Sequence, residues 1–181
     1  ILMSLEKETG IKVEIISGKK ESEIVAKNDI ISHIGKTKNY CFIDVGGGST
    51  EVIIYKKNTF YKSKSFKIGG VRLINGLVTD STWSDFKIWL ETNATELKKL
   101  KIIGIGGNIN KIYKISGVKY TKPLTLKKFK NTLDKLEKMS YQKKLIKLKL
   151  NPDRIDVIHP AGRIYFFLLK TLSIKEIYVP K

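Results

Sequence analysis

The segment from residue 40 to residue 55 restricts the fold of this chain more than any other part of it. An apolar run ends at Asp44, three glycines occupy positions 46–48, and polar residues from Ser49 to Glu51 lead into a second apolar run. Two apolar runs joined by a short glycine-rich connection are typical of antiparallel strands with a tight turn. Because side chains alternate along a strand, such a hairpin brings Asp44 and Glu51 to the same mouth.

The connection in this hairpin has the chemistry of a phosphate site. Glycine has no Cβ, so the backbone of residues 46–48 can approach a ligand closely and direct N–H groups at it, and Ser49 adds a hydroxyl. Asp44 and Glu51 supply hard oxygen ligands, which suit a Mg²⁺ ion that bridges to phosphate oxygens. Neither a Walker A motif nor a dinucleotide fingerprint is present. The alternative is a glycine turn with two solvated carboxylates.

The rest of the pattern alternates strands with helices, which predicts an α/β fold. Residues 58–67 alternate in the manner of a third strand of a meander, and the apolar run at 101–105 is typical of a buried strand. The other expected elements are a strand at 12–17, helices at 21–34, from 70 to about 77, from about 83 to 100, at 109–115, at 125–139 and at 141–149, a helix opened by Asn151 and Pro152 and kinked at Pro160, and a strand at 176–179.

A second glycine turn follows the expected strand at 101–105. Gly106, Gly107 and Asn108 lead from it into a helix, and a helix N-terminus after a glycine turn is a generic anion site. Asn108 is a suitable cap for this helix. Arg72 stands at the start of a short helix, from which it could reach a phosphate, although an arginine in such a place more often pairs with a nearby acid.

The sequence Asp-Val-Gly-Gly-Gly-Ser-Thr-Glu at residues 44–51 closely resembles a signature loop of the exopolyphosphatase/guanosine pentaphosphate phosphatase family. This resemblance implies a ribonuclease-H-like α/β fold, with a mixed twisted sheet flanked by helices, as in actin, sugar kinases and Hsp70 ATPases. Departures from the family pattern occur at Lys20 and Ser22, where Glu and Ala are usual, and at Asn108, where many relatives have Thr. Further segments that resemble the family are 16–22, 69–73, 106–108 and 152–160.

The resemblance implies hydrolysis of terminal phosphoanhydride bonds in inorganic polyphosphate or in guanosine pentaphosphate and related (p)ppGpp-type substrates. It implies that Glu21 is the catalytic residue that activates water, and a helix start would keep this carboxylate ionised. The alternative is that Glu21 has no catalytic role and is simply an acidic residue in the first turn of a helix, where acidic residues are common. Mg²⁺ is the implied cofactor, with Asp44 and Glu51 as metal ligands. The implied phosphate-binding residues are Gly46, Gly47, Gly48, Ser49, Gly106, Gly107, Asn108 and Arg72.

The resemblance extends over essentially the whole chain but not over the family's whole catalytic unit. Family members hold phosphate between two lobes, and the Asp-x-Gly-Ser-Asn-Ser-like loop of the first lobe is not found in this sequence. We therefore expect residues 1–38 to be the C-terminal part of the first lobe, which carries Glu21. Residues 39–181 are expected to form the second ribonuclease-H-like lobe, with the phosphate-binding hairpin. The chain is then part of a longer protein and can be inactive alone.

The net charge of +18 comes almost entirely from lysine. Such a charge favours polyanionic partners, although A/T-rich coding would enrich lysine without any selection for binding. Nucleic acid is the less expected partner, and a homodimer is compatible with the sequence. The single cysteine, Cys41, has no partner for an internal disulfide, and no signal peptide or membrane-length apolar run is found. A cytoplasmic protein without a membrane partner is therefore expected.

Two other classes of function stay open on the sequence. The first is an ATP-binding member of the same superfamily, such as a kinase or an Hsp70-like ATPase, which a nucleotide-dependent thermal shift would reveal. The second is a non-catalytic basic module that binds polyphosphate or RNA. Such a module would bind with a steep salt dependence and would be indifferent to the loss of Asp44 or Glu51.

Overall fold

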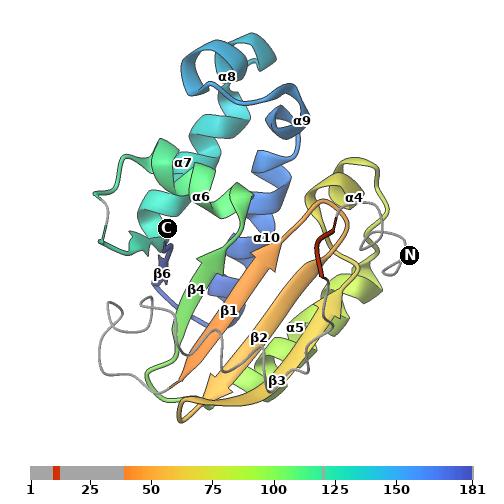
Figure 1. The fold of residues 1–181 in the computed structure, drawn as a ribbon, viewed down its shortest axis with the longest axis vertical. Coiled ribbons are helices and arrows are strands. Elements are labelled where there is room, and N and C mark those ends of the chain that lie inside the picture. Colours follow the sequence, from red (N-terminus) through yellow and green to blue (C-terminus); the bar gives the residue numbers. More distant parts are fainter. Residues whose placement is uncertain (1–9, 13–38, 120, 181) are drawn as a thin grey trace.

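A six-stranded mixed sheet forms the centre of the computed structural model, which describes residues 10–12, 39–119 and 121–180 (Figure 1). The strand order across the sheet is β3-β2-β1-β4-β6-β5. An antiparallel meander followed by strands parallel to its first member is the ribonuclease-H-like order, so the expected fold class is confirmed. The strands are β1 (Tyr40–Val45), β2 (Thr50–Lys56), β3 (Thr59–Phe66), β4 (Lys101–Ile105), β5 (Leu124–Thr125) and β6 (Glu176–Tyr178).

The predicted hairpin is present and its register is fixed. In β1 and β2, Asp44 pairs with Glu51 and Val45 pairs with Thr50. The turn from β2 to β3 has Lys57 and Asn58 in the left-handed region, at φ 53° and 62°, which matches the right-handed twist of the flanking strands. β4 then pairs in parallel with β1, and β6 pairs in parallel with β4. The two-residue strand β5, which pairs with β6, was not predicted.

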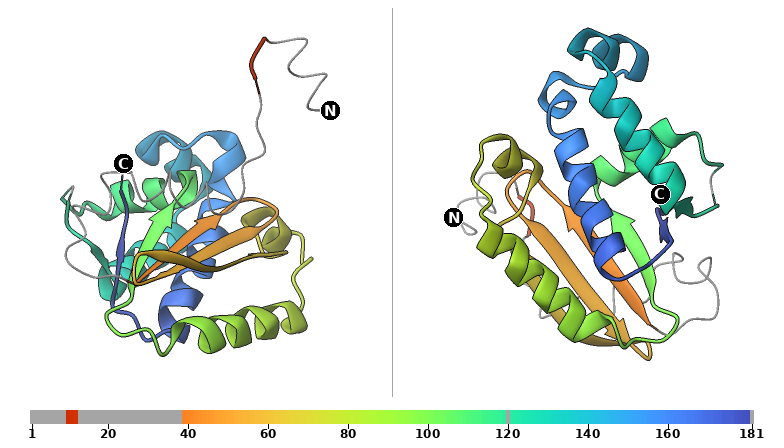
Figure 2. Two further views of the ribbon diagram at one scale, coloured as in Figure 1. Left: turned by 60° about the horizontal axis from the view of Figure 1, so that its bottom comes forward. Right: turned by 180° about the vertical axis from the view of Figure 1, so that it is seen from behind.

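The main hydrophobic core lies between one face of the sheet and the helices (Figure 2). Cys41 and Ile43 of β1 face this core, where Phe86 of one helix and Tyr165 of another are fully buried. The apolar stripe of each packed helix therefore covers this face. The helices are α4 (Gly70–Ile74), α5 (Asp80–Ala94), α6 (Gly107–Ser116), α7 (Leu126–Lys138), α8 (Tyr141–Leu148), α9 (Pro152–Ile155) and α10 (Ile158–Thr171).

The opposite face of the sheet carries a smaller apolar cluster. Its buried members are Tyr40, Phe42, Tyr55 and Ile103, and the rings of Phe42 and Tyr55 meet edge to face at 5.5 Å. Side chains alternate along β1, so Asp44 projects to this second face together with Phe42. The polar end of the hairpin, where Asp44 lies, is therefore on the face of the sheet opposite to the helix-covered core.

Several helix ends differ from the sequence predictions. Helix α5 begins at Asp80 and is capped by the Thr79 hydroxyl, which accepts from the Thr82 amide, and the helix ends at Ala94. Pro160 does not kink a continuous helix, because α9 ends at Ile155 and a separate helix, α10, begins at Ile158. Pro160 lies in the first turn of α10, where its missing N–H is not needed. Asn151 is the N-cap of α9 but makes no side-chain cap hydrogen bond.

The predicted boundary between lobes at residues 38 and 39 stays a prediction. The strand expected at 12–17, the helix expected at 21–34 and Glu21 lie outside the described residues, apart from Lys12. Within the described ranges, no helix is long and apolar enough to cross a membrane.

Candidate functional site

Two loops meet at the carboxyl ends of the parallel strands β1 and β4, at the upper end of the sheet in Figure 1. The first is the glycine loop, residues 46–49, which connects β1 to β2. The second is the turn at Gly106, which connects β4 to helix α6 and has φ +93°, a conformation that favours glycine. Both predicted anion-binding turns are therefore brought to one place, as expected for loops that follow parallel neighbours.

Helix α4 donates hydrogen bonds to the carbonyl groups of the glycine loop. The amide of Gly70 donates to the Gly46 carbonyl at 3.0 Å, and the amide of Val71 donates to the Gly47 carbonyl at 2.9 Å. The side chain of Arg72 completes this set, because its Nε donates to the Gly48 carbonyl at 2.8 Å. The first turn of α4 is therefore satisfied by the loop. Among the described residues Arg72 makes no recorded ion pair, so the expected acid partner is not seen.

The same hydrogen bonds orient the amides of the loop. In a trans peptide the C=O and N–H groups point in opposite directions, and no cis peptide occurs among the described residues. Since the carbonyls of residues 46–48 point to α4, the amides of Gly47, Gly48 and Ser49 point away from it. Within the described ranges none of these three amides has a recorded backbone acceptor. Three adjacent N–H groups of this kind form an anion-binding concavity.

Close packing explains why a glycine precedes α4. A Cβ built on Gly69 would overlap the carbonyl group of Gly47 and lie 2.7 Å from the carbonyl carbon of Gly48. A side chain at position 69 would therefore push the glycine loop off the start of α4. In the sequence this glycine stands out only as part of a segment similar to the family, and nothing in the sequence predicts its contact with the loop.

Asp44 and Glu51 face each other across the hairpin. They are directly opposed in the register of β1 and β2, so both side chains lie on the same face. Glu51 accepts a hydrogen bond from the hydroxyl of Ser65 at 2.9 Å. Burial, and then the Glu51 carboxylate, raise the pKa of Asp44, while the nearby backbone amide of Val45 acts in the opposite direction. The pair thus concentrates negative charge at the mouth of the hairpin.

The two loops are joined by side chains that were not all foreseen. Asp44 packs directly against Gly106, where a Cβ would overlap its carboxylate. Asn108 was expected to cap α6, but the N-cap is Gly106, and the Asn108 side chain instead donates to the Val45 carbonyl at 2.8 Å. Tyr165 of α10 accepts from the Val45 amide at 3.1 Å and donates to the Ile105 carbonyl at 2.8 Å. No sequence motif pointed to Tyr165.

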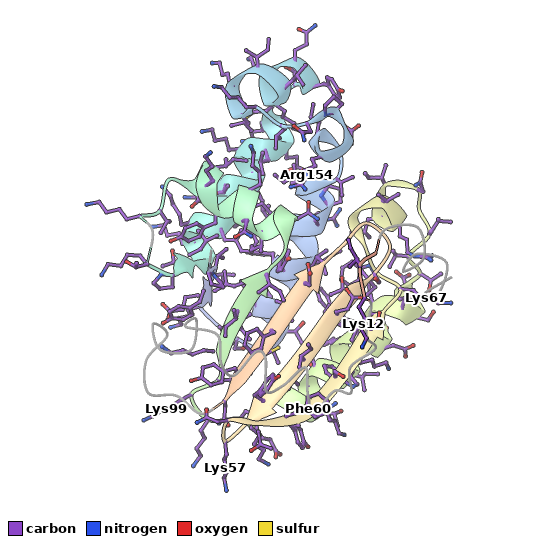
Figure 3. All side chains as sticks on the ribbon, in the orientation of Figure 1. Lys12, Lys57, Phe60, Lys67, Lys99 and Arg154 are labelled. Carbon is purple, nitrogen blue, oxygen red and sulfur yellow. The ribbon has the colours of Figure 1, made fainter. Side chains whose placement is uncertain are left out.

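A guanidinium covers the start of helix α6. Arg154, from α9, lies so close to Gly107 that a Cβ built there would be 2.7 Å from its Nη1 (Figure 3). In the sequence Arg154 stands only in a segment that resembles the family, and it is not among the predicted site residues. Burial, followed by the cations of Lys114 and Arg154, lowers the pKa of Lys111, so several positive groups gather on this side. A cation beside a helix N-terminus strengthens an anion site.

The carboxylates at the mouth of the hairpin fit a Mg²⁺ ion. In the described part of the chain no group of three or more His, Cys, Asp or Glu side chains could hold a metal ion. Mg²⁺, however, is usually bound through one or two carboxylates and completes its shell with water and substrate phosphates. Asp44 and Glu51 are two opposed carboxylates, and burial followed by the charge of Glu51 raises the pKa of Asp44; a divalent cation would offset the repulsion between them. The residues present therefore fit Mg²⁺.

The fold is a ribonuclease-H-like α/β domain in which the two predicted anion-binding loops lie at the same end of the sheet. The chain belongs to the Ppx/GppA phosphatase family, whose family model matches residues 1–180. It is similar to a bifunctional 3-dehydroquinate synthase/phosphatase of Fusobacterium nucleatum, with 32% identity over 114 residues that cover 55% of this chain and 17% of that protein.

Two solved structures show the same fold. The Ppx/GppA family member of Aquifex aeolicus matches with a TM-score of 0.70 and 23% identity over 99% of this chain and 64% of that chain. An exopolyphosphatase from Cytophaga hutchinsonii matches with a TM-score of 0.68 and 22% identity over 99% of this chain and 65% of that chain. The chain therefore spans less than two thirds of the length of these structures and about a sixth of the curated relative.

Proposed function

We propose that this chain is the second-lobe part of a phosphatase that hydrolyses terminal phosphoanhydride bonds of inorganic polyphosphate or guanosine pentaphosphate. The proposal rests on three consecutive amides, those of Gly47, Gly48 and Ser49. These amides point away from α4, because residues of α4 donate hydrogen bonds to the loop carbonyls on the other side. Membership in the Ppx/GppA phosphatase family and similarity to a protein described as an exopolyphosphatase support the same reaction class.

In this proposal the backbone binds the terminal phosphate. The amides of the glycine loop and the hydroxyl of Ser49 donate to phosphate oxygens, and the N-terminus of α6 at Gly107 faces the same anion. Arg154 neutralises charge from the α6 side, since its guanidinium already lies against Gly107. Preorganised donors of this kind stabilise charge as it develops on transferring phosphoryl groups without reorganisation.

Asp44 and Glu51 would hold Mg²⁺ at the mouth of the hairpin. The ion supplies charge neutralisation for the phosphate oxygens. The chain keeps the two carboxylates in place through the β1–β2 register and through the hydrogen bond from Ser65 to Glu51. The pairing of β1 with β4, to which Tyr165 adds a hydrogen bond at each strand end, keeps the glycine loop and the Gly106 turn side by side, so that they can contact one phosphate group together.

Glu21 is assigned the role of general base by the family resemblance alone, because it lies outside the described residues. As a carboxylate it would accept a proton from the attacking water. Replacement of Glu21 by Gln keeps the size of the side chain but removes its charge and this basicity. Turnover should therefore be abolished while phosphate binding is retained.

The decisive experiment measures phosphate release from long-chain polyphosphate and from guanosine pentaphosphate with Mg²⁺. It compares this chain with the chain joined to the upstream lobe that the family resemblance leads us to expect, and it includes Glu21→Gln. Activity that requires the upstream lobe and Glu21 supports the proposal. Tight, salt-sensitive binding of polyphosphate without turnover in either version would favour the non-catalytic polyanion-binding module instead.

A further inference from the structure

Thr50 lies in the signature segment, residues 44–51, but has no part in the proposed reaction. It begins β2 directly after the glycine loop, where it pairs with Val45 of β1 and with Phe66 of β3. Its side chain is fully buried. Because side chains alternate along a strand, Thr50 points into the helix-covered core while Glu51 points to the opposite face. The Thr50 hydroxyl is therefore directed away from the face on which Asp44 and Glu51 lie.

This hydroxyl binds the segment that leads into α4. The Oγ1 of Thr50 donates to the carbonyl of Ile68 at 2.6 Å. Ile68 is itself fully buried, and within the described ranges no other donor to its carbonyl is recorded. The Ile68 amide donates to the Phe66 carbonyl at 2.7 Å, so the chain turns sharply between the end of β3 and the start of α4. The Thr50 hydroxyl thus attaches this turn to the first residue of β2.

The residues that follow Ile68 are the ones that contact the glycine loop. Gly69 packs against the backbone of the loop, and the amides of Gly70 and Val71 donate to two of the loop carbonyls. Helix α4 accordingly lies beside the turn between β1 and β2 (Figure 1). A closed ring of contacts therefore runs from the loop through Thr50 to the start of α4, and from α4 back to the loop.

We propose that Thr50 is a positioning residue for the anion-binding amides of the glycine loop. Its hydroxyl fixes the Ile68 carbonyl, which fixes the start of α4 against the loop, and the hydrogen bonds from α4 to the loop carbonyls orient the loop amides. This role rests on the proposed function, in which those amides bind phosphate. The alternative is that the hydroxyl only satisfies a buried carbonyl, so that its loss would lower stability without a specific effect on binding.

Three variants separate these two roles. Thr50→Val keeps the size and branching of the side chain but leaves the buried Ile68 carbonyl without its partner. Thr50→Ser keeps the hydroxyl and deletes a buried methyl group, so it lowers stability while it retains the hydrogen bond. Thr132→Val is the matched control, because Thr132 is also buried, at 4% exposure, and its hydroxyl donates to the Lys128 carbonyl at 2.8 Å within α7.

The experiment measures three quantities on the intact chain and on each variant: tripolyphosphate affinity in Mg²⁺ by titration calorimetry, stability by urea denaturation, and hydrogen exchange of the Gly70 and Val71 amides by NMR. Thr50→Val is expected to weaken tripolyphosphate binding by about tenfold. It should also speed exchange of the two amides, because their bonds to the loop open more often. Thr50→Ser and Thr132→Val should keep the natural affinity and the natural exchange of these amides, although Thr50→Ser lowers the urea midpoint.

Three results would overturn the proposal. Thr50→Val binds tripolyphosphate as tightly as the natural chain, while Gly106→Ala weakens binding; the loops then bind the anion without help from Thr50, and the proposed function stands. Thr50→Ser loses as much affinity as Thr50→Val, which shows that the size of the side chain matters and the hydroxyl does not. The natural chain does not bind tripolyphosphate, or binds it equally well after Gly106→Ala; the proposed function then fails, and the role of Thr50 fails with it.

Discussion

The phenol oxygen of Tyr165 lies 3.1 Å from the amide nitrogen of Val45, from which it accepts a hydrogen bond. The same hydroxyl donates to the carbonyl oxygen of Ile105, so one buried side chain of α10 joins the ends of β1 and β4. The glycine loop begins directly after Val45, and the Gly106 turn begins directly after Ile105. Helix α10 therefore ties together, from the covered side of the sheet, the paired strand ends that precede the two predicted anion-binding turns.

Replacement of Tyr165 by Phe should destabilise the chain and weaken anion binding together. The change leaves the Val45 amide and the Ile105 carbonyl buried without this partner, at a cost of about 1–3 kcal/mol. Burial raises the pKa of the Tyr165 phenol, so the hydroxyl stays protonated and the effect should not vary with pH between 6 and 9. Urea denaturation measures the first effect, and tripolyphosphate affinity in Mg²⁺ measures the second.

Tyr113→Phe is the matched control for this change. The Tyr113 hydroxyl also bonds to the backbone, since its single proton lies within reach of the carbonyls of Lys119 and Lys122, but these lie in the segment after α6. A similar loss of stability with unchanged tripolyphosphate affinity is expected. Equal losses of affinity in both variants would show that Tyr165 acts only through global stability.

Gly106→Ala should be far more damaging than an equivalent change at another glycine of positive φ. Gly106 has φ +93°, and a Cβ there would overlap the carboxylate of Asp44. Gly117 has φ +67° with no atom within 4 Å of an added Cβ, so Gly117→Ala isolates the backbone cost of about 1 kcal/mol. Urea denaturation should show a clearly larger loss for Gly106→Ala. Mg²⁺-dependent tripolyphosphate binding should fall only in that variant, and equal behaviour of the two would contradict the contact with Asp44.

The hairpin was predictable because its information is local. Apolar runs with an intervening glycine turn specify β1 and β2 within one segment, and strand alternation then places Asp44 and Glu51 on one face. The strand at 101–105 was predictable for the same reason, from a short apolar run followed by glycines. The meeting of the two loops required only the additional rule that parallel neighbouring strands end at the same edge.

What the sequence did not predict depends on contacts between distant segments. Strand β5 has only two residues and exists through its pairing with β6, so no periodic pattern reveals it. Tyr165 resembles any core aromatic residue until the ends of β1 and β4 are placed beside it. Asn108 follows the rule for a helix cap, but the nearby Val45 carbonyl offers its side chain a different partner. Such choices are decided by packing, which a single sequence does not display.

Asp44→Asn should stabilise the chain at neutral pH. The pKa of Asp44 is raised above its ordinary value of 3.8, chiefly by burial and then by Glu51, so the folded state binds its proton more tightly than the unfolded state. The stability linked to this group is complete below pH 3.8 and is lost as pH rises through the raised pKa. Thermal unfolding from pH 3.5 to 8 should therefore show a smaller decline for Asp44→Asn than for the natural chain.

Mg²⁺ should reverse this difference in stability. A divalent cation that relieves the repulsion between Asp44 and Glu51 should raise the melting temperature of the natural chain and have little effect on Asp44→Asn. Asp85→Asn, an exposed carboxylate of α5, is the control and should respond to Mg²⁺ as the natural chain does. An identical Mg²⁺ response in all three proteins would show that the ion does not bind at this carboxylate pair.

Arg154→Gln should weaken tripolyphosphate binding without destabilising the chain. Arg154 is exposed, and its guanidinium lies against Gly107 at the start of α6, so it contributes charge to the anion and no buried contact to the core. Loss of a charge-assisted hydrogen bond predicts a decrease of about tenfold in affinity. Arg154→Lys should restore part of the affinity, because lysine keeps the charge but not the planar fork.

Arg163→Gln is the matched control, because Arg163 is an exposed arginine of α10 and its loss removes the same charge from elsewhere on the surface. Titration calorimetry at two salt concentrations separates a local contact, lost only with Arg154, from a general effect of the positive field, which would weaken binding equally in both variants.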